Sequence, residues 1–264
     1  MSLDASYGTG TRLLGRAAAA TALLVAATLA AWTVLLGAVS AVAAAGWLCA
    51  AGAVHVVETR ALYAHLDENR RLGERRVLPG LGSANAVTLV RGTLFAWTGG
   101  FLAVALVAGA GAFAAGPLSW APALAYGVGA LLDGADGALA RATGRVTVLG
   151  EHLDAEFDGL GLLVAALVGV AVGAMPAAYL LAGVSRYVWL AARSLRTLRG
   201  RPLAALPERS SRRALAGLQM CYAFVALCPL TGSTVGTVGA AVVGGPFLLG
   251  WVRDWLYATG RLTE

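Results

Sequence analysis

Apolar residues occur in this chain as long blocks, and the first block is the longest. It runs from Ala17 to Val57 without a charged residue, after a short polar segment that ends at Arg16. As one helix it would reach roughly 60 Å, about twice the thickness of a bilayer core. It is also too long for the apolar core of a signal peptide. Residues 1–57 are therefore predicted to form a tail and a two-span hairpin that turns between Gly37 and Ser40.

Six shorter apolar runs follow, and each is long enough for one further span. They cover approximately Asn85 to Ala112, Pro117 to Leu139, Asp154 to Gly173, Pro176 to Leu195, Ala214 to Leu230 and Thr234 to Tyr257. The expected fold class is all-α, a polytopic membrane helix bundle of eight spans. Residues 82–264 would form its six-span core, and the hairpin would be accessory.

A polar stretch from Glu58 to Gly80 separates the hairpin from the core. It holds five arginines, with apolar residues interspersed among them. This mixture predicts a cytoplasmic juxtamembrane amphipathic helix in the membrane interface over residues 58–81. A solvated connector is the alternative. Pro79 and Gly80 are expected to end the segment.

Charged residues gather at one set of span ends. The connections near Gly37, Gly116, Met175 and Thr231 contain no charged residue, whereas arginines and acidic residues collect at the opposite ends. By the positive-inside rule, the charged ends and both termini are predicted to be cytoplasmic. The expected location is the inner or plasma membrane of a bacterium, with the acidic residues described below on the cytoplasmic side.

The composition agrees with a membrane protein. Hydrophobic residues make up 58% and charged residues 13% of the 264 positions, which is not the balance of a soluble domain. All 20 basic residues are arginines, which we attribute to a GC-rich genome. Because they lie at the ends of apolar runs, anionic lipid head groups are the expected partners and nucleic acid is not. The three cysteines lie in apolar runs and are expected to be buried free thiols.

Four aspartates are the candidate chemical groups: Asp133, Asp136, Asp154 and Asp158. The first two are three residues apart and the last two are four apart, so each pair shares a helix face. A short turn between the pairs would bring all four carboxylates together, where they repel one another unless a cation lies among them. Oxygen ligands suit Mg²⁺, Mn²⁺ or Ca²⁺, and a pair of Mg²⁺ or Mn²⁺ ions is predicted. The alternative is four interfacial carboxylates that are solvated or paired with arginines.

The spacing of these aspartates resembles the signature of the CDP-alcohol phosphotransferase family. The chain reads Asp133-x-x-Asp136-Gly137-x-x-Ala140-Arg141, eight residues, then Gly150-x-x-x-Asp154-x-x-x-Asp158, and it matches the signature at every specified position. A weaker match, Asn85-x-x-Thr88-x-x-Arg91, resembles the start of that family's first core helix, with Ala84 in place of the usual proline. The resemblance covers about residue 82 to the C-terminus.

The resemblance implies a role for each aspartate. Asp133, Asp136 and Asp154 would hold metal. Asp158 would also contact metal and would act as the general base that takes the proton of an acceptor hydroxyl. The other matching residues would bind the nucleotide or the rest of the donor: Asn85, Thr88, Gly137, Ala140, Arg141 and Gly150.

Four arginines are candidates for binding the phosphate of an acceptor: Arg91, Arg145, Arg186 and Arg193. For Arg91 and Arg186, which fall within predicted spans, the alternative is snorkelling toward the interface. The stretch from Arg193 to Arg213 holds seven arginines. It is expected first to set the topology and only second to attract acceptor phosphates.

The implied function is transfer of a phosphatidyl or other substituted phosphoryl group from a CDP-alcohol to an alcohol acceptor, with release of CMP. CDP-diacylglycerol is the expected donor, and phospholipid biosynthesis is the expected process. The arginines favour a phosphorylated polyol such as glycerol 3-phosphate or inositol phosphate as acceptor; inositol, serine and other alcohols stay open. The resemblance also implies a homodimer.

Two other functions use similar residues. A Mg²⁺-dependent membrane prenyltransferase would carry two aspartate clusters in separate halves of its bundle, whereas these four aspartates lie close together in the sequence. A cation transporter would place its carboxylates at mid-span, and no internal repeat is visible in this chain.

Overall fold

The computed structural model describes residues 3–142, 146–201, 203–206 and 209–262, with the backbone alone for residues 3–7 and 135–142. In this part of the chain the regular elements are helices, and strand pairing is limited to two isolated bridges. The helices are α1 (Leu3–Leu35), α2 (Ala41–Ala64), η1 (Leu66–Glu68), α3 (Gly82–Ala108), η2 (Ala110–Phe113), α4 (Pro117–Ala142), α5 (Val148–Ala171), η3 (Ala177–Tyr179), α6 (Leu180–Leu198), α7 (Ser210–Leu227), α8 (Ser233–Gly239), η4 (Ala240–Gly244) and α9 (Gly245–Ala258). The predicted all-α fold is confirmed.

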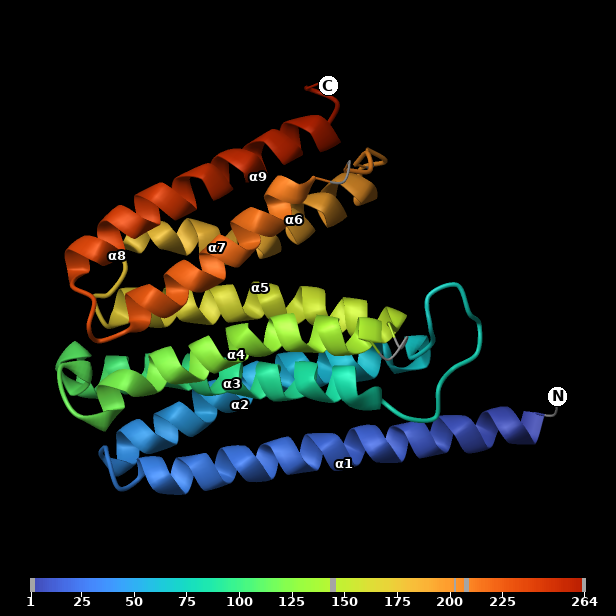
Figure 1. The fold of residues 1–264 in the computed structure, drawn as a ribbon, viewed down its shortest axis with the longest axis horizontal. Coiled ribbons are helices and arrows are strands. Elements are labelled where there is room, and N and C mark those ends of the chain that lie inside the picture. The colour runs from blue at the N-terminus through green and yellow to red at the C-terminus, as the bar shows by residue number, and fades with distance from the viewer. Residues whose placement is uncertain (1–2, 143–145, 202, 207–208, 263–264) are drawn as a thin grey trace.

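The long helices form an up-and-down bundle whose connections alternate between two ends (Figure 1). One end carries the connections over residues 36–40, 109–116, 172–179 and 228–232, which contain no charged residue. The described chain ends and the connections after α2, α4 and α6 lie at the other end (Figure 1). The bundle therefore has one uncharged end and one charged end, as the distribution of arginines predicted.

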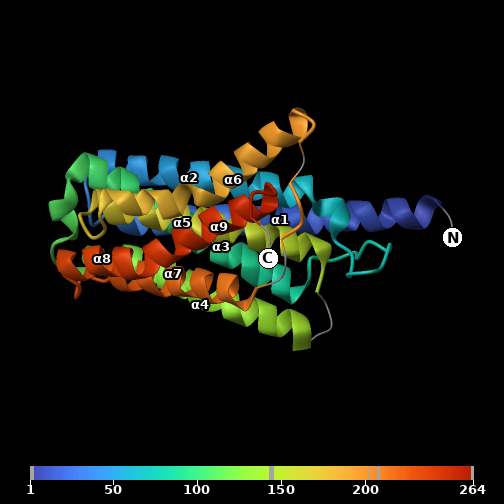
Figure 2. The ribbon, with the colours of Figure 1, turned by 90° about the horizontal axis from the view of Figure 1, so that it is seen from above.

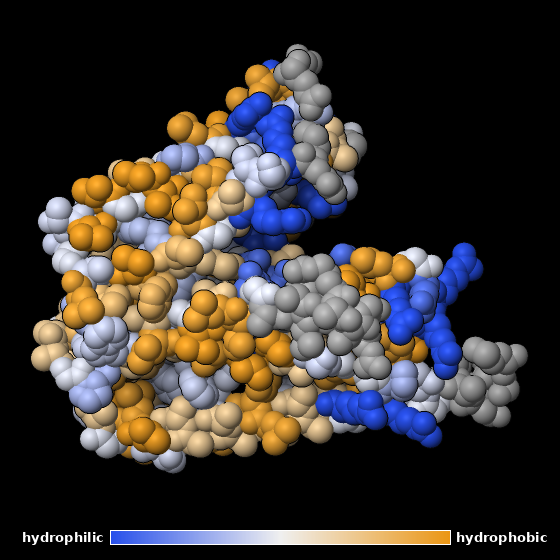
Figure 3. Space-filling view, in the orientation of Figure 1, coloured by the Kyte–Doolittle hydropathy of each residue, from blue (hydrophilic) through white to orange (hydrophobic). Residues whose placement is uncertain are grey.

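Among the described residues, four helical segments are long and apolar enough to cross a membrane: Gly8–Leu35, Ala41–Ala64, Gly82–Ala108 and Ser233–Ala258. The last one combines α8, η4 and α9, which follow one another without a break. Apolar side chains cover much of the visible surface away from the charged end (Figure 3). Eight helical passes correspond to the eight predicted segments, and the number that cross a bilayer stays a prediction.

The N-terminal hairpin turns where the sequence predicted. Helix α1 ends at Leu35, and α2 begins at Ala41 behind Ser40, whose hydroxyl accepts a hydrogen bond from the Ala43 amide at 3.2 Å. The helix of α1 begins already at Leu3, so most of the expected tail belongs to it. This N-terminal part extends past the other helices (Figure 2).

The prediction of one continuous helix over residues 58–81 is wrong, whereas the position of this segment in the membrane interface stays a prediction. Helix α2 continues to Ala64, the short η1 follows, and the remainder is irregular. The Asn69 side chain gives a physical reason, because its amide donates to the carbonyls of Leu78 at 3.1 Å and Gly80 at 2.9 Å. Such bonds close the segment into a loop and compete with helical hydrogen bonding.

The cysteines are free thiols, but the prediction that they are buried is wrong. Cys49 and Cys221 are exposed, and Cys228 is half-buried. In a bundle of apolar helices, apolar neighbours in the sequence do not distinguish an inward face from an outward one.

Helix α3 contacts α2, α4 and α5 and holds them together. Its buried Phe95 ring lies against two glycines, since a Cβ added at Gly129 of α4 or Gly161 of α5 would come within 2.7 Å of the ring. Likewise, a Cβ at Gly100 would come within 2.6 Å of Trp47 on α2. Missing side chains thus allow close helix approach. This packing fixes α3, α4 and α5 relative to one another, and these helices carry the site described next.

Candidate active site

Three aspartates from two helices converge toward the charged end of the bundle. Asp133 comes from α4, whereas Asp154 and Asp158 come from the first half of α5, and one carboxylate oxygen of each lies within 4.8 Å of the others. The spacing predicted this convergence. Asp136 lies nearly one turn after Asp133 on the helical backbone of α4, but its side chain is outside the described residues.

The guanidinium of Arg91 on α3 binds all three carboxylates. Its Nη1 donates to Oδ1 of Asp133, and its Nη2 donates to Oδ1 of Asp154 at 2.6 Å and lies 3.3 Å from Oδ1 of Asp158. The Arg91 side chain is fully buried, so it does not snorkel to the interface. A planar guanidinium with five donors suits this task, because it can face several carboxylates at once.

The carboxylates themselves remain accessible. Their side chains are 31%, 47% and 38% exposed for Asp133, Asp154 and Asp158, respectively, whereas Arg91 is 0% exposed. The arginine therefore offsets part of the negative charge from the buried side of the group, and the other side faces solvent. Three oxygen donors in such an arrangement fit a hard divalent cation, for which carboxylates are the preferred protein ligands.

The start of α5 is fixed by a buried polar junction. The Asn85 amide nitrogen of α3 lies 3.4 Å from Oδ1 of Asn69 and 3.2 Å from Oγ1 of Thr147. Thr147 caps α5 by accepting a hydrogen bond from the Gly150 amide at 3.0 Å. A Cβ at Gly150 would lie 2.7 Å from Oδ1 of Asn85, so only glycine allows this approach. The junction orients the helix turn that leads to Asp154.

This junction accounts structurally for two residues that were expected to bind the donor, Asn85 and Gly150. Thr88, nearly one turn after Asn85, is 4% exposed and donates to the Ala84 carbonyl at 3.1 Å. A donor-binding role for these residues stays a prediction. Asn69 and Thr147 were not predicted as part of the site, because both lie in connections between the predicted spans, where polar residues are ordinary.

A cavity of about 310 Å³ lies beside Asp158, between α5, α6, α7 and α9. Asp158 and Gly159 line it from α5, Arg186 from α6 and Gln219 from α7. Arg186 crosses over Gly159, where an added Cβ would overlap its Cδ. The absent side chain of Gly159 therefore lets this arginine pack against α5, in the cavity that Asp158 also lines.

Arg186 has one acidic partner in the described part of the chain. Its Nη2 donates to Oε1 of Glu156 at 3.1 Å, and its Nε is buried without a hydrogen-bond partner among the described residues. The sequence did not identify Glu156, although an arginine within an apolar run signals that a counter-ion lies nearby. Gln219 was also not predicted as a site residue. A polar amide within an apolar run was the only indication of it in the sequence.

The remaining predicted residues lie elsewhere or outside the description. Arg193 is exposed on α6, about two turns after Arg186. Only the backbone is described for Gly137, Ala140 and Arg141, and Arg145 lies outside the described residues. Their predicted contributions to the site therefore stay predictions.

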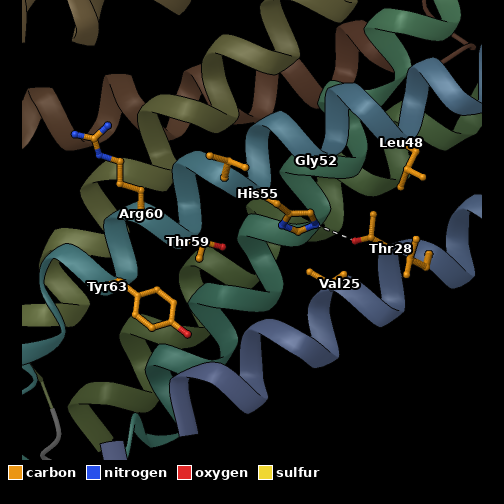
Figure 4. A pocket seen from close by; sticks show the side chains of 10 residues that line it. Val25, Thr28, Leu48, Gly52, His55, Thr59, Arg60 and Tyr63 are labelled. Atoms are coloured by element: carbon orange, nitrogen blue, oxygen red, sulfur yellow. Dashed lines mark hydrogen bonds between the residues drawn. The ribbon is translucent and has the colours of Figure 1, made fainter. Parts of the chain in front are cut away.

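A larger cavity, of about 460 Å³, lies between α1 and α2 and contains none of the aspartates (Figure 4). His55 and Thr28 point toward each other across it, with Nε2 2.8 Å from Oγ1. Its other walls are largely apolar, for example at Val25 and Leu48. Because it offers no cluster of ligands for a metal or a phosphate, size alone does not make it the candidate site.

A family model described as CDP-alcohol phosphatidyltransferase matches residues 81–252 of the chain. The matched range includes Arg91 and the three clustered aspartates, and it begins just before α3, so the hairpin lies outside it. No curated protein and no solved structure matches the chain. The match covers more than half of the 264 residues. The family transfers phosphatidyl groups from CDP-alcohols, which disfavours both the transfer of a prenyl group and the transport of a cation. The chain therefore belongs to the CDP-alcohol phosphatidyltransferase family.

Proposed function

We propose that this protein transfers the phosphatidyl group of CDP-diacylglycerol to a small phosphorylated alcohol, with release of CMP, as a step of phospholipid biosynthesis. The family supports transfer from a CDP-alcohol, and the proposal concerns the donor and the acceptor. The observation that carries it is the shared cavity of Asp158 and Arg186. Its volume of about 310 Å³ lies at the lower end of the usual range for ligand pockets, about 300–1,000 Å³. A polyol phosphate suits this volume better than a second lipid does.

Arg186 would bind the phosphate of the acceptor. Guanidinium groups form paired, charge-assisted hydrogen bonds with phosphate oxygens. Glu156 holds Nη2 of this arginine, which would orient the remaining donors, including the buried Nε, toward the cavity. The acceptor hydroxyl would then lie at the Asp158 side of the cavity.

Asp158 would be the general base. Its carboxylate would take the proton from the acceptor hydroxyl as the oxygen attacks the phosphorus of the phosphatidyl group. The bond between that phosphorus and the oxygen of CMP breaks, and CMP leaves with the electron pair. The 38% exposure of the Asp158 side chain leaves it accessible to such an acceptor.

Asp133, Asp154 and Asp158, with Asp136 as a fourth candidate, would hold Mg²⁺ or Mn²⁺. Such ions, when bound, would neutralise the diphosphate of the donor and the departing CMP. Arg91 would keep the carboxylates together from their buried side. The cytoplasmic side of the membrane would supply CDP-lipid and acceptor to this end of the bundle, and a homodimer is the proposed assembly.

The test is a panel of alcohols presented to the purified protein with CDP-diacylglycerol and Mg²⁺. We expect CMP release and a new lipid with glycerol 3-phosphate or an inositol phosphate. Arg186→Gln should raise the KM for that acceptor at least tenfold while leaving the KM for CDP-diacylglycerol nearly unchanged. Arg193→Gln is the matched control, because Arg193 lies on the exposed surface of the same helix. Product formation only with uncharged alcohols would contradict the proposed acceptor.

A further inference from the structure

Two of the three histidines in the chain meet at a second site near the charged end of the bundle. His65 follows the last turn of α2, and His152 lies in the second turn of α5. Their rings stack with centroids 4.2 Å apart and planes 8° apart. Between the ends of these two helices lies Glu68 of η1, whose Oε2 is 2.9 Å from Nδ1 of His65 and 3.1 Å from Nε2 of His152. Side chains far apart in the sequence thus converge on one carboxylate oxygen.

We propose that His65, Glu68 and His152 form a binding site for a transition-metal ion of the Zn²⁺ class. Two imidazole nitrogens and a carboxylate oxygen are a recurring ligand set for Zn²⁺, with a fourth position left for water. With metal–ligand bonds of about 2.0–2.1 Å, neighbouring ligand atoms of a tetrahedral site lie roughly 3.3 Å apart. The observed separations of 2.9 and 3.1 Å differ from this by only a few tenths of an ångström. An imidazole nitrogen binds metal in the plane of its ring, so admitting the ion requires the two stacked rings to turn as well as a small outward movement of the side chains.

Access and ligand chemistry support the same assignment. The side chains of His65, Glu68 and His152 are 35%, 33% and 45% exposed, so an ion can reach them from solvent. The three ligand atoms lie within 4.8 Å of one another. Imidazole nitrogen favours Zn²⁺ and its neighbours in the transition series, whereas Mg²⁺ and Mn²⁺ favour oxygen ligands. The two ligand sets of the described residues therefore select different ions.

The site is distinct from the aspartate cluster even though His152 and Asp154 are close in sequence. Residues two apart on a helix do not face the same way. His152 turns toward η1 and Glu68, and Asp154 turns toward Arg91 on α3. A metal at the histidine site ties the connection after α2 to the start of α5. It adds to the Asn69–Asn85–Thr147 junction, which fixes the same helix start.

The experiment uses full-length protein without a polyhistidine tag, stripped of metal and kept in excess Mg²⁺ to occupy oxygen-ligand sites. Co²⁺ is titrated as a spectroscopic probe and then displaced with Zn²⁺. We expect about one equivalent of Co²⁺ with the intense visible bands of a tetrahedral nitrogen-containing site, and their loss when Zn²⁺ is added. His65→Ala and His152→Ala should abolish the bands. Asp154→Asn should retain them, which separates this site from the proposed catalytic one.

Two further comparisons keep the test decisive. Glu68→Gln should weaken Co²⁺ binding at least tenfold, while Glu151→Gln, a change at an exposed acid beside His152, should not. Zn²⁺ should raise the melting temperature of the wild type and of Glu151→Gln but not that of His152→Ala. If the wild type gives no saturable Co²⁺ bands, or if the bands survive both histidine substitutions, the metal site is overturned. The three residues then form only a hydrogen-bonded contact between η1, α2 and α5. That outcome leaves the proposed transferase function untouched, because the assay of CMP release tests it separately.

Discussion

Two groups of polar residues lie inside this apolar bundle, and they are built on different principles. In the core, Arg91 contacts Asp133, Asp154 and Asp158. In the hairpin, Oγ1 of Thr28 lies 2.8 Å from Nε2 of His55, and Nδ1 of His55 lies 3.0 Å from Oε2 of Glu58. The Trp97 indole of α3 donates to the same Thr28 oxygen at 2.9 Å. Both groups satisfy polar atoms that burial would otherwise destabilise.

The difference lies in charge and access. Among the described residues, one arginine faces three aspartates, so acidic groups outnumber basic ones there, and the carboxylates are partly exposed. Thr28, His55 and Glu58 are each less than 10% exposed and contain a single acid. A soluble cation can therefore exchange with the core group, whereas the hairpin group is closed to solvent. Buried polarity in a membrane bundle indicates a reactive site only when it combines excess charge with access.

The largest effect is expected from removing divalent metal. EDTA should reduce CMP formation to background, because the anionic core group is proposed to clamp the donor diphosphate through metal. Added Mg²⁺ or Mn²⁺ should restore it. Helical content, measured by circular dichroism, should not change, because Arg91 still forms ion pairs with the aspartates. Full turnover in EDTA would show that the aspartates do not act through a bound metal ion.

Asp158→Asn should lower turnover by about 10² or more, the scale of a missing general base. The amide keeps the size of the side chain but cannot accept the proton. Binding of CDP-lipid should stay close to that of the wild type, as measured by equilibrium binding alongside the rate of CMP formation. Glu151→Gln provides the matched control on the same helix.

Two results would move the assignment of the base. Turnover near the wild-type rate would make Asp158 a spectator. Loss of donor binding together with turnover would make it chiefly a metal ligand.

In the absence of metal, Arg91→Ala should destabilise the protein by less than the about 3–5 kcal/mol typical of removing one partner of a fully buried ion pair, because the three carboxylates left behind are partly exposed. Arg91→Lys keeps the charge but not the fork of donors, so its effect should be smaller. Mg²⁺ should raise the melting temperature of Arg91→Ala more than that of the wild type, because metal then replaces the lost cation. Equal shifts in both proteins would show that arginine and metal do not share the carboxylates.

The sequence predicted the helices and the meeting of the aspartates because both follow from local spacing. Apolar run length marks a helix, and residues three or four apart share its face. It did not predict the loop that Asn69 closes or the pairing of Arg186 with Glu156, since both depend on which helices become neighbours. The partner of Arg91 could not be chosen for the same reason. Three carboxylates surround it only after α3, α4 and α5 pack around Phe95.

The smallest effect is expected from Glu58→Gln in the hairpin. The amide has nearly the shape of the carboxylate and can keep the contact with Nδ1 of His55, so stability should change by no more than about 1 kcal/mol. Turnover should stay within about twofold of the wild type, since the hairpin lies outside the matched family range.

The packing around Glu58 nevertheless offers a way for its substitution to change turnover more strongly. A Cβ built on Gly92 would lie 3.0 Å from Oε1 of Glu58 and 2.6 Å from the Phe157 ring, so the glutamate, α3 and the residue before Asp158 pack closely together. Glu58→Ala, which empties more space at this contact, is the companion variant. If Glu58→Gln lowered turnover as strongly as Asp158→Asn while the melting temperature stayed the same, the hairpin group would act on the site through Phe157. The distinction between a reactive group in the core and a packing group in the hairpin would then fail.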